Sequence, residues 1–187
     1  MSSLRPDLPP VPDRLPAGPV VLRPFRDGDV AMAVDLATDP YVPLTGSLPA
    51  HADADQALAW VRRQQGRVAE GVGYALAIAD RDSDEALGQI GLWSRALDEG
   101  RLAVGYAVAP SARGRGVAAA ALTALTSFAW TVPGAHRVEL VVEPWNEASI
   151  RTAERAGYRR EGLLRSYRDI GGRRRDLLLF ARVRGDG

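Results

Sequence analysis

The stretch Val104–Ala118, which reads VGYAVAPSARGRGVA, constrains the fold more than any other part of the chain. An apolar strand runs into Pro110, an Arg/Gly turn follows, and the alanine-rich segment Val117–Trp130 then predicts a helix. The first N–H groups of a helix lack intrahelical partners, and the aligned peptide dipoles place partial positive charge there. Glycines let a ligand approach the backbone without meeting a Cβ atom. A strand, a glycine turn and a helix in this order therefore predict a phosphate-binding site.

The turn itself supplies four residues to this candidate site. Arg113 and Arg115 offer positive charge to phosphate oxygens, and Gly114 and Gly116 keep the backbone open. The residues lack the G-K-[ST] of a Walker P-loop, and they do not spell the G-x-G-x-x-G of dinucleotide sites. A plain strand–turn–helix junction with a charged surface loop is the alternative interpretation of these few residues.

The run from Arg113 through Gly116 to Ala118 spells R-x-x-G-x-A. This resembles the [Q/R]-x-x-G-x-[G/A] signature of the acetyl-CoA pyrophosphate loop in GNAT N-acetyltransferases. The resemblance implies that the pyrophosphate of acetyl-CoA binds the backbone amides of this loop, which would make cofactor-binding residues of Arg113, Gly114, Arg115, Gly116, Val117 and Ala118.

The order of the expected elements extends the resemblance to residues 20–183. Period-2 and period-3.6 patterns, bounded by Gly, Pro and Asp, predict seven strands and four helices. The order matches a GNAT fold of the α/β (α+β) class: a mixed, mostly antiparallel twisted sheet of about seven strands, flanked by about four helices and splayed between strands 4 and 5. The expected strands are Val20–Pro24, Tyr74–Ala79, Ala86–Trp93, Leu102–Val108, His136–Val142, Gly162–Ile170 and Asp176–Val183, and the expected helices are Asp27–Thr38, Asp53–Ala69, Val117–Trp130 and Asn146–Ala156.

Length and composition predict one globular domain. Of 187 residues, 46% are hydrophobic and 25% are charged. Six of the 13 prolines fall in residues 1–19, which predicts a Pro-rich extended N-terminal arm before a single domain over residues 20–187. No apolar run approaches the length of a membrane span and no secretory signal is visible, so we expect a cytoplasmic protein with no membrane partner, either a monomer or a homodimer.

Cysteine is absent and only His51 and His136 are present, which excludes disulfides and argues against a metal site. The charge is uneven, with an excess of carboxylates before residue 110 and an excess of arginine after it. This asymmetry suggests two differently charged ligands or a basic surface. A nucleic-acid binder that uses Arg173–Arg175 would rest on charge alone, and nucleic acid is not the expected partner.

A second motif begins at Glu143 and reads EPWNEAS to Ser149, then continues through Gly157-Tyr158 to a Glu-Gly pair and Arg165. It resembles the RimJ/RimL-type branch of the GNAT family, where N-x-x-S opens a helix and G-[FY]-x-x-E-G-x-x-R follows. The resemblance implies that Asn146 contacts the pantetheine arm and that Ser149 protonates the departing thiolate. Asn146 is also a favoured N-cap residue, and one side chain can fill both roles.

The resemblance also implies how the donor thioester is held. Tyr106, Ala107 and Val108 would line the thiol channel, and the N–H near Val108 would donate to the thioester oxygen. Tyr106 is a candidate for proton relay. Many relatives carry Glu where this chain has Ala103, so the general base stays open.

Three residues are weaker candidates for the base, namely Glu99, Asp98 and His51. A base is dispensable for an α-amine acceptor, whose pKa near 8 leaves a useful neutral fraction at physiological pH.

The expected function is therefore acetyl-CoA-dependent transfer of an acetyl group to a primary amine, with acetyl-CoA as co-substrate. The acceptor is a protein N-terminal α-amine or a small-molecule amine. A non-catalytic acyl-CoA-binding module and a transferase for a different acyl-CoA are the alternatives. Six aspartates of the N-terminal half suggest a cationic acceptor, although helix caps and solvated loops explain them equally well: Asp27, Asp29, Asp35, Asp39, Asp53 and Asp55.

Overall fold

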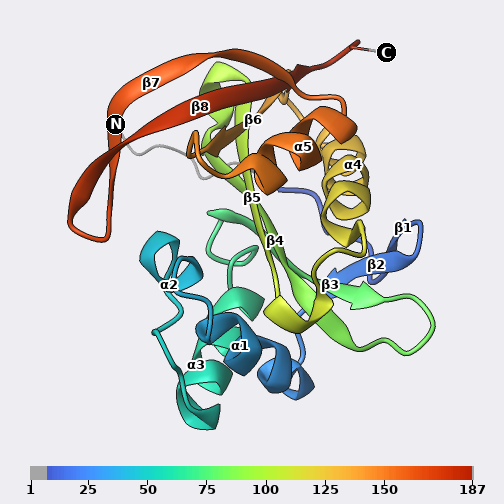
Figure 1. The fold of residues 1–187 in the computed structure, drawn as a ribbon. Coiled ribbons are helices and arrows are strands. Elements are labelled where there is room, and N and C mark those ends of the chain that lie inside the picture. Colours follow the sequence, from blue (N-terminus) through green and yellow to red (C-terminus); the bar gives the residue numbers. More distant parts are fainter. Residues whose placement is uncertain (1–7, 187) are drawn as a thin grey trace.

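The described part of the chain folds around one open sheet of eight strands in the order β1-β2-β3-β4-β5-β6-β8-β7 (Figure 1). The computed structural model describes residues 8–186. Neighbouring strands are antiparallel except β5 and β6, which are parallel. The sheet is thus mixed and mostly antiparallel, as expected. The strands are β1 (Leu15–Ala17), β2 (Val20–Pro24), β3 (Gly73–Asp80), β4 (Ala86–Ala96), β5 (Arg101–Val108), β6 (Arg137–Val142), β7 (Arg159–Ile170) and β8 (Arg173–Val183).

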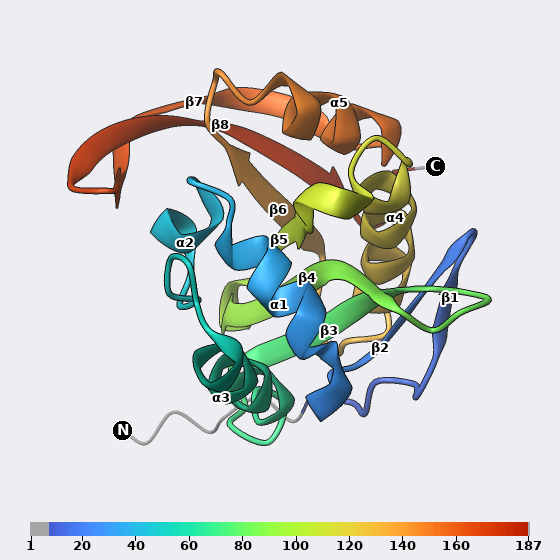
Figure 2. The ribbon, with the colours of Figure 1, turned by 60° about the horizontal axis from the view of Figure 1, so that its bottom comes forward.

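Five α-helices within residues 8–186 flank the sheet. In Figure 2, α1 and α3 lie on one face, and α4 lies on the other with α5 beside it. The helices are α1 (Val30–Ala37), α2 (Val42–Thr45), α3 (Ala54–Gln65), α4 (Val117–Ala129) and α5 (Glu147–Arg155). The apolar face of α4 packs on the sheet, and its residues Val117, Ala121, Leu125 and Phe128 are all buried.

Strand β3 shows why both faces need a helical layer. Tyr74, Leu76 and Ile78 point into the core under α4, whereas Ala75 and Ala77 point into a second core under α1 and α3. Side chains of a strand alternate between the two faces, so a strand covered on both sides is apolar throughout. The two cores therefore hold the sheet between the helices.

The expectation that the Pro-rich arm is not part of the fold is wrong for its described portion. Leu15–Ala17 form β1, which pairs with β2 and makes the sheet eight strands wide. Leu8 and Val11 pack against the core, and the Tyr74 hydroxyl donates a 2.7 Å hydrogen bond to the Pro9 carbonyl. Residues 1–7 of the predicted arm lie outside the described residues.

Some expected helix limits also change. The loop expected over residues 39–52 contains the single turn α2, which begins at Val42. The helix expected from Asp27 starts at Val30, because Asp27–Asp29 form a 3-10 turn. The helix expected to reach Ala69 ends at Gln65. Tertiary contacts decide these ends, and residue propensity predicts them poorly.

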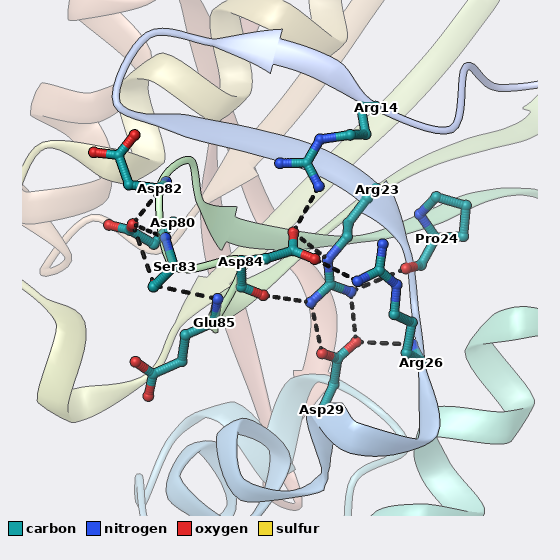
Figure 3. Close-up of polar contacts among 10 residues, drawn as sticks. All are labelled: Arg14, Arg23, Pro24, Arg26, Asp29, Asp80, Asp82, Ser83, Asp84 and Glu85. Atoms are coloured by element: carbon teal, nitrogen blue, oxygen red, sulfur yellow. Dashed lines mark hydrogen bonds and ion pairs between the residues drawn. The ribbon is translucent and has the colours of Figure 1, made fainter.

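Asp29 precedes α1, but its side chain makes no cap hydrogen bond to that helix. It pairs instead with the buried guanidinium of Arg23 at 2.8 Å (Figure 3). Asp84, in the β3–β4 turn, contacts the same guanidinium and also accepts hydrogen bonds from Arg14 and Arg26. This ion network joins the N-terminal arm, β2, the start of α1 and the β3–β4 turn.

Asp84→Asn tests how much this network stabilises the fold. Burial opposes ionisation of Asp84, but hydrogen bonds from Arg26 and Arg14 and the charge of Arg23 outweigh it and lower the pKa of this carboxyl to about 2. A lowered pKa contributes stability above the unfolded-state pKa of about 3.9, and that contribution is lost as pH falls through the folded-state value. Asp84→Asn should therefore lower the Tm at pH 7, by about 2–4 °C per kcal/mol for a chain of this size.

The Tm difference between wild type and Asp84→Asn should narrow between pH 4 and pH 2, as followed by thermal melts. Asn tolerates the positive φ of 60° at this position, so backbone strain does not confound the comparison. Asp82→Asn is the matched control, because the Asp82 side chain in the same turn is 93% exposed. A difference in Tm that does not change with pH would contradict the assigned role.

Candidate active site

Strands β5 and β6 separate after a short paired stretch. Only Arg101–Ala103 of β5 pair with Arg137–Glu139 of β6, and β5 then continues to Val108 beside β4 alone. The expected splay between predicted strands 4 and 5 is therefore confirmed. The Ala109 N–H donates to β4, so by alternation the main-chain groups of Tyr106 and Val108 face the split.

The Arg/Gly turn lies directly after β5 and leads into α4. Gly114 and Gly116 have φ values of 77° and 73°, and a Cβ atom on either glycine would meet nothing within 4 Å. The N–H groups of residues 114–119 donate to no acceptor within residues 8–186. Asp53 and Asn146 cap α3 and α5 with their side chains, whereas no side chain caps α4. The amides at the start of α4 are thus available to an anion.

The two arginines of this turn have partners inside the protein. The Arg113 guanidinium donates to Asp39 at 2.6 Å and to the Val108 carbonyl at 3.1 Å. Arg115 lies 3.6 Å from Asp80. Arg113 therefore fastens the turn to the end of β5 and to the loop after α1, a role that sequence reasoning missed.

The remaining expected donor-site residues occupy distinct positions around the split. Ala107 and Val108 end β5. Val117 is buried in the core, so only its backbone is open to a ligand, while Ala118 lies in the first turn of α4.

Tyr106 and Ser149 come together on the α4–α5 side of the sheet. The Tyr106 hydroxyl and Ser149 Oγ are 2.7 Å apart, within hydrogen-bond distance. Burial raises the pKa of Tyr106, opposed by hydrogen bonds with Ser149 and Thr152, so the phenol keeps its proton at neutral pH. Asn146 Oδ1 accepts from the Ser149 N–H at 3.1 Å, which confirms the capping role and orients the first turn of α5. Two hydroxyls expected to handle protons are therefore directly coupled.

Two of the weaker candidates for the base, Asp98 and Glu99, lie far from this pair. Asp98 and Glu99 belong to the 3-10 turn before β5, and Glu99 pairs with Arg101. At about 3.3 Å per residue, the length of β5 places them on the order of 25 Å from Val108. His51 precedes α3 and is exposed.

Most of the aspartates considered for a cationic acceptor have partners in the chain. Asp27 pairs with Arg62 at 2.7 Å, Asp35 accepts from Ser111 at 2.6 Å, and Asp53 caps α3. Asp29 and Asp39 pair with Arg23 and Arg113, as described above. These carboxylates therefore hold the N-terminal elements together, and the structural explanation accounts for them.

Sequence reasoning missed one buried carboxylate near the split. Glu143 follows β6 directly and is only 3% exposed. Its neighbours are Tyr41, from the α1–α2 loop, and Arg175 Nε, 3.7 Å from Oε1. Alternation along β6 predicts the face on which Glu143 lies, but its burial depends on residues about 100 positions before it and 30 after it.

Within residues 8–186, no helix is long and apolar enough to cross a membrane. In the same part of the chain, no group of three or more His, Asp or Glu side chains is arranged to hold a metal ion.

Residues 20–159 match the family model described as an acetyltransferase (GNAT) domain. An uncharacterized N-acetyltransferase, p20 of Bacillus licheniformis, is 27% identical over 162 residues, which span 87% of this chain and 91% of the relative. Among solved structures, Mycobacterium smegmatis RimJ in complex with CoA-disulfide is 28% identical with a TM-score of 0.72, and the match covers 96% of this chain and 90% of that one.

RimL, a ribosomal L7/L12 alpha-N-protein acetyltransferase solved in complex with coenzyme A, superimposes with a TM-score of 0.74 over 91% of this chain and 97% of that chain. At 17% identity this likeness shows the fold alone. The match to the GNAT domain covers most of the chain, and the observed fold is the one that this family predicts. The chain therefore belongs to the GNAT acetyltransferase family and is an N-acetyltransferase.

Proposed function

We propose that this enzyme binds acetyl-CoA across the β5–β6 split and transfers the acetyl group directly to the α-amine of a polypeptide N-terminus. One observation carries the proposal: the sheet opens beside loop amides that have no partner within residues 8–186 and beside the coupled hydroxyls of Tyr106 and Ser149. The CoA-bound structures of RimJ and RimL support the choice of donor.

The donor is held from its pyrophosphate to its sulfur. The pyrophosphate binds the backbone amides of Arg113–Ala118, where the dipole of α4 adds partial positive charge. The pantetheine arm enters the split and meets Asn146 at the start of α5. The thioester then lies beside Ala107 and Val108, with the Val108 N–H donating to its carbonyl oxygen.

The chemistry needs one nucleophile and one proton donor. The amine nitrogen attacks the thioester carbon, a C–N bond forms, and the C–S bond breaks as the tetrahedral adduct collapses. Ser149 gives a proton to the departing sulfur, and the Tyr106 hydroxyl, 2.7 Å away, replaces it. The solvent restores the proton of Tyr106, and the nitrogen releases a proton as the amide forms.

The basic β7–β8 hairpin favours a polypeptide acceptor with acidic residues after its N-terminus. Arg165, Arg168, Arg173 and Arg174 are exposed on this hairpin. Its turn reaches α2, where a Cβ atom on Gly171 would lie 3.2 Å from the Leu44 side chain. The hairpin and α2 therefore border the face of the sheet that carries α1 and α3. We take this face as the acceptor side, where the arginines attract carboxylates. RimL, which shares this fold, is named as an alpha-N-protein acetyltransferase.

Gly116→Val tests the donor site. A Val side chain would cover the loop amides and remove charge-assisted hydrogen bonds of about 1.5–3 kcal/mol each, so affinity for CoA should fall at least about tenfold. Calorimetric titration with CoA measures the change. Gly172→Val is the matched control, because Gly172 has a φ of 76° against 73° at Gly116 and equally open surroundings. Equal CoA affinity in two folded variants would exclude the loop as the pyrophosphate site.

Ser149→Ala and Tyr106→Phe test the proton pathway. Both should lower kcat by about 10²–10⁴-fold, with little change in the KM for acetyl-CoA, because the interaction forms only as the sulfur departs. Thiol release in steady-state assays measures both constants. Tyr158→Phe is the control, since it removes a comparable 2.7 Å hydroxyl pair with Thr126 away from the split. If Tyr158→Phe lowers kcat as much as Tyr106→Phe, then core packing and not proton transfer explains the loss.

A panel of acceptors tests the function itself. Peptides with free N-termini and acidic second to fifth residues should have a higher kcat/KM than basic peptides, and salt should shrink the difference because it screens the hairpin arginines. N-terminally blocked peptides should not react. If only small amines such as polyamines are acetylated, the proposed polypeptide acceptor is wrong. If only a longer acyl-CoA reacts, the proposed donor is wrong.

A further inference from the structure

Glu143 is a buried carboxylate that the proposed chemistry does not use. Burial alternates along β6, where Val138, Leu140 and Val142 point into the core under α4. Glu143 therefore continues the opposite row, on the face that carries α1 and α2. Tyr106 and Ser149 lie on the α4–α5 face. The carboxylate and the proton-donating hydroxyls thus occupy opposite sides of the opened sheet.

The strand register places Glu143 level with the end of β5. Ala103 pairs with Glu139 at the last rung of the parallel ladder. Four residues further along each strand are Ala107 and Glu143, which lie at the same height on the two edges of the split. Ala107 also packs on the α1–α3 side. Glu143 therefore faces the acceptor side at the level proposed for the thioester.

Tyr41 and Arg175 surround the Glu143 carboxylate, but the contact with Arg175 is too long for a hydrogen bond. Burial, and then the interaction with the Glu143 carboxylate and its charge, raise the pKa of Tyr41, so its hydroxyl stays protonated beside that carboxylate. Arg175 Nε is buried, makes no hydrogen bond within residues 8–186, and lies 3.7 Å from Glu143 Oε1, which is an ion pair and not a hydrogen bond. Arg168 is close enough to act on Tyr41 by its charge.

The cation that covers Glu143 belongs to the exposed hairpin. The Arg175 side chain is 39% exposed, whereas that of Glu143 is 3% exposed. Arg175 stands on β8, on the same face as Glu143, and exposed Trp145 lies beside Tyr41 with ring centroids 5.1 Å apart. A displaced Arg175 would leave a carboxylate that is oriented by Tyr41, bordered by an aromatic ring and deprived of its counter-ion. An ammonium group is the natural replacement.

We infer that Glu143 receives the ammonium of the acceptor in place of the Arg175 guanidinium and accepts its proton before the nitrogen attacks. This inference rests on the proposed function and names its general base. R–NH3⁺ and the carboxylate give R–NH2 and the carboxylic acid, and the acid returns its proton to solvent. The second proton that the nitrogen loses, as the adduct collapses, balances the proton that Ser149 gives to the sulfur.

Glu143→Gln keeps the size of the side chain and removes the base. With a peptide acceptor at pH 7, kcat/KM should fall about tenfold or more, because only about a tenth of an α-amine with a pKa near 8 is neutral there. The acidic limb of the pH–rate profile should move toward the pKa of the free α-amine, near 8, because only the neutral amine can then react. Affinity for acetyl-CoA should not change. Glu139→Gln is the matched control, four residues earlier on the same face of β6 and paired with Arg101 and Arg137.

Arg175→Gln separates this role from a purely structural one. If the acceptor ammonium replaces the guanidinium, Arg175→Gln should leave the KM for the peptide unchanged or lower it, whereas Glu143→Gln should raise it. A structural ion network predicts the same direction for both variants, with parallel losses of Tm, and that result would overturn the inference. The inference would also be overturned if Glu143→Gln kept the wild-type kcat/KM and an unshifted pH profile.

Wild-type turnover distinguishes the two levels of the proposal. If wild type acetylates peptides and Glu143→Gln does so equally well, the inference fails and the proposed function stands. If wild type releases no CoA thiol with any amine, both fail together.

Discussion

The early end of the β5–β6 ladder is the constraint on which the rest of the structure depends. Backbone N–H and C=O groups strongly prefer partners, and a buried group without one costs about 1–3 kcal/mol. A sheet therefore opens only where the separating strands are held from their other sides. Strand β4 holds β5 along its length, β8 holds β6 over all six residues, and the Gly100 carbonyl accepts from His136 and Arg137 at the closed end. The opening can then receive a polar ligand.

Side chains alternate between the two faces of the sheet along β5 and β6, so the candidate catalytic groups are divided between the faces. Even-numbered residues of β5 and β6, such as Tyr106 and Val142, point toward α4 and α5, and odd-numbered ones such as Ala107 point toward α1 and α3. In the proposed mechanism, the groups that protonate the leaving thiol and deprotonate the amine would therefore lie on opposite faces of the sheet. Such an arrangement would suit direct transfer, because the amine could approach the thioester carbon from the face opposite the proton donors.

Charge pairing explains which contacts sequence-based reasoning missed. Asp29 stands where a helix cap is expected, but the buried Arg23 guanidinium needs a counter-ion more than the helix needs a cap. Asp39 and Arg113 neutralise each other across the turn and the loop after α1. An arginine and an aspartate more than 70 residues apart give no local signal, so their pairing could not be predicted from the sequence.

The sequence by itself determined the elements and the family, because their signals are local. The strand, glycine turn and helix of Val104–Ala118, the alternation of β6 and the motif from Asn146 to Ser149 all depend on spacing within a few residues. Tertiary structure alone decided that the N-terminal arm adds a strand, that Tyr106 meets Ser149, and that Glu143 is buried beneath Tyr41 and Arg175. Those outcomes depend on which distant segments lie on the same face of the sheet. The order of the strands decides this, and that order exists only when the whole chain has folded.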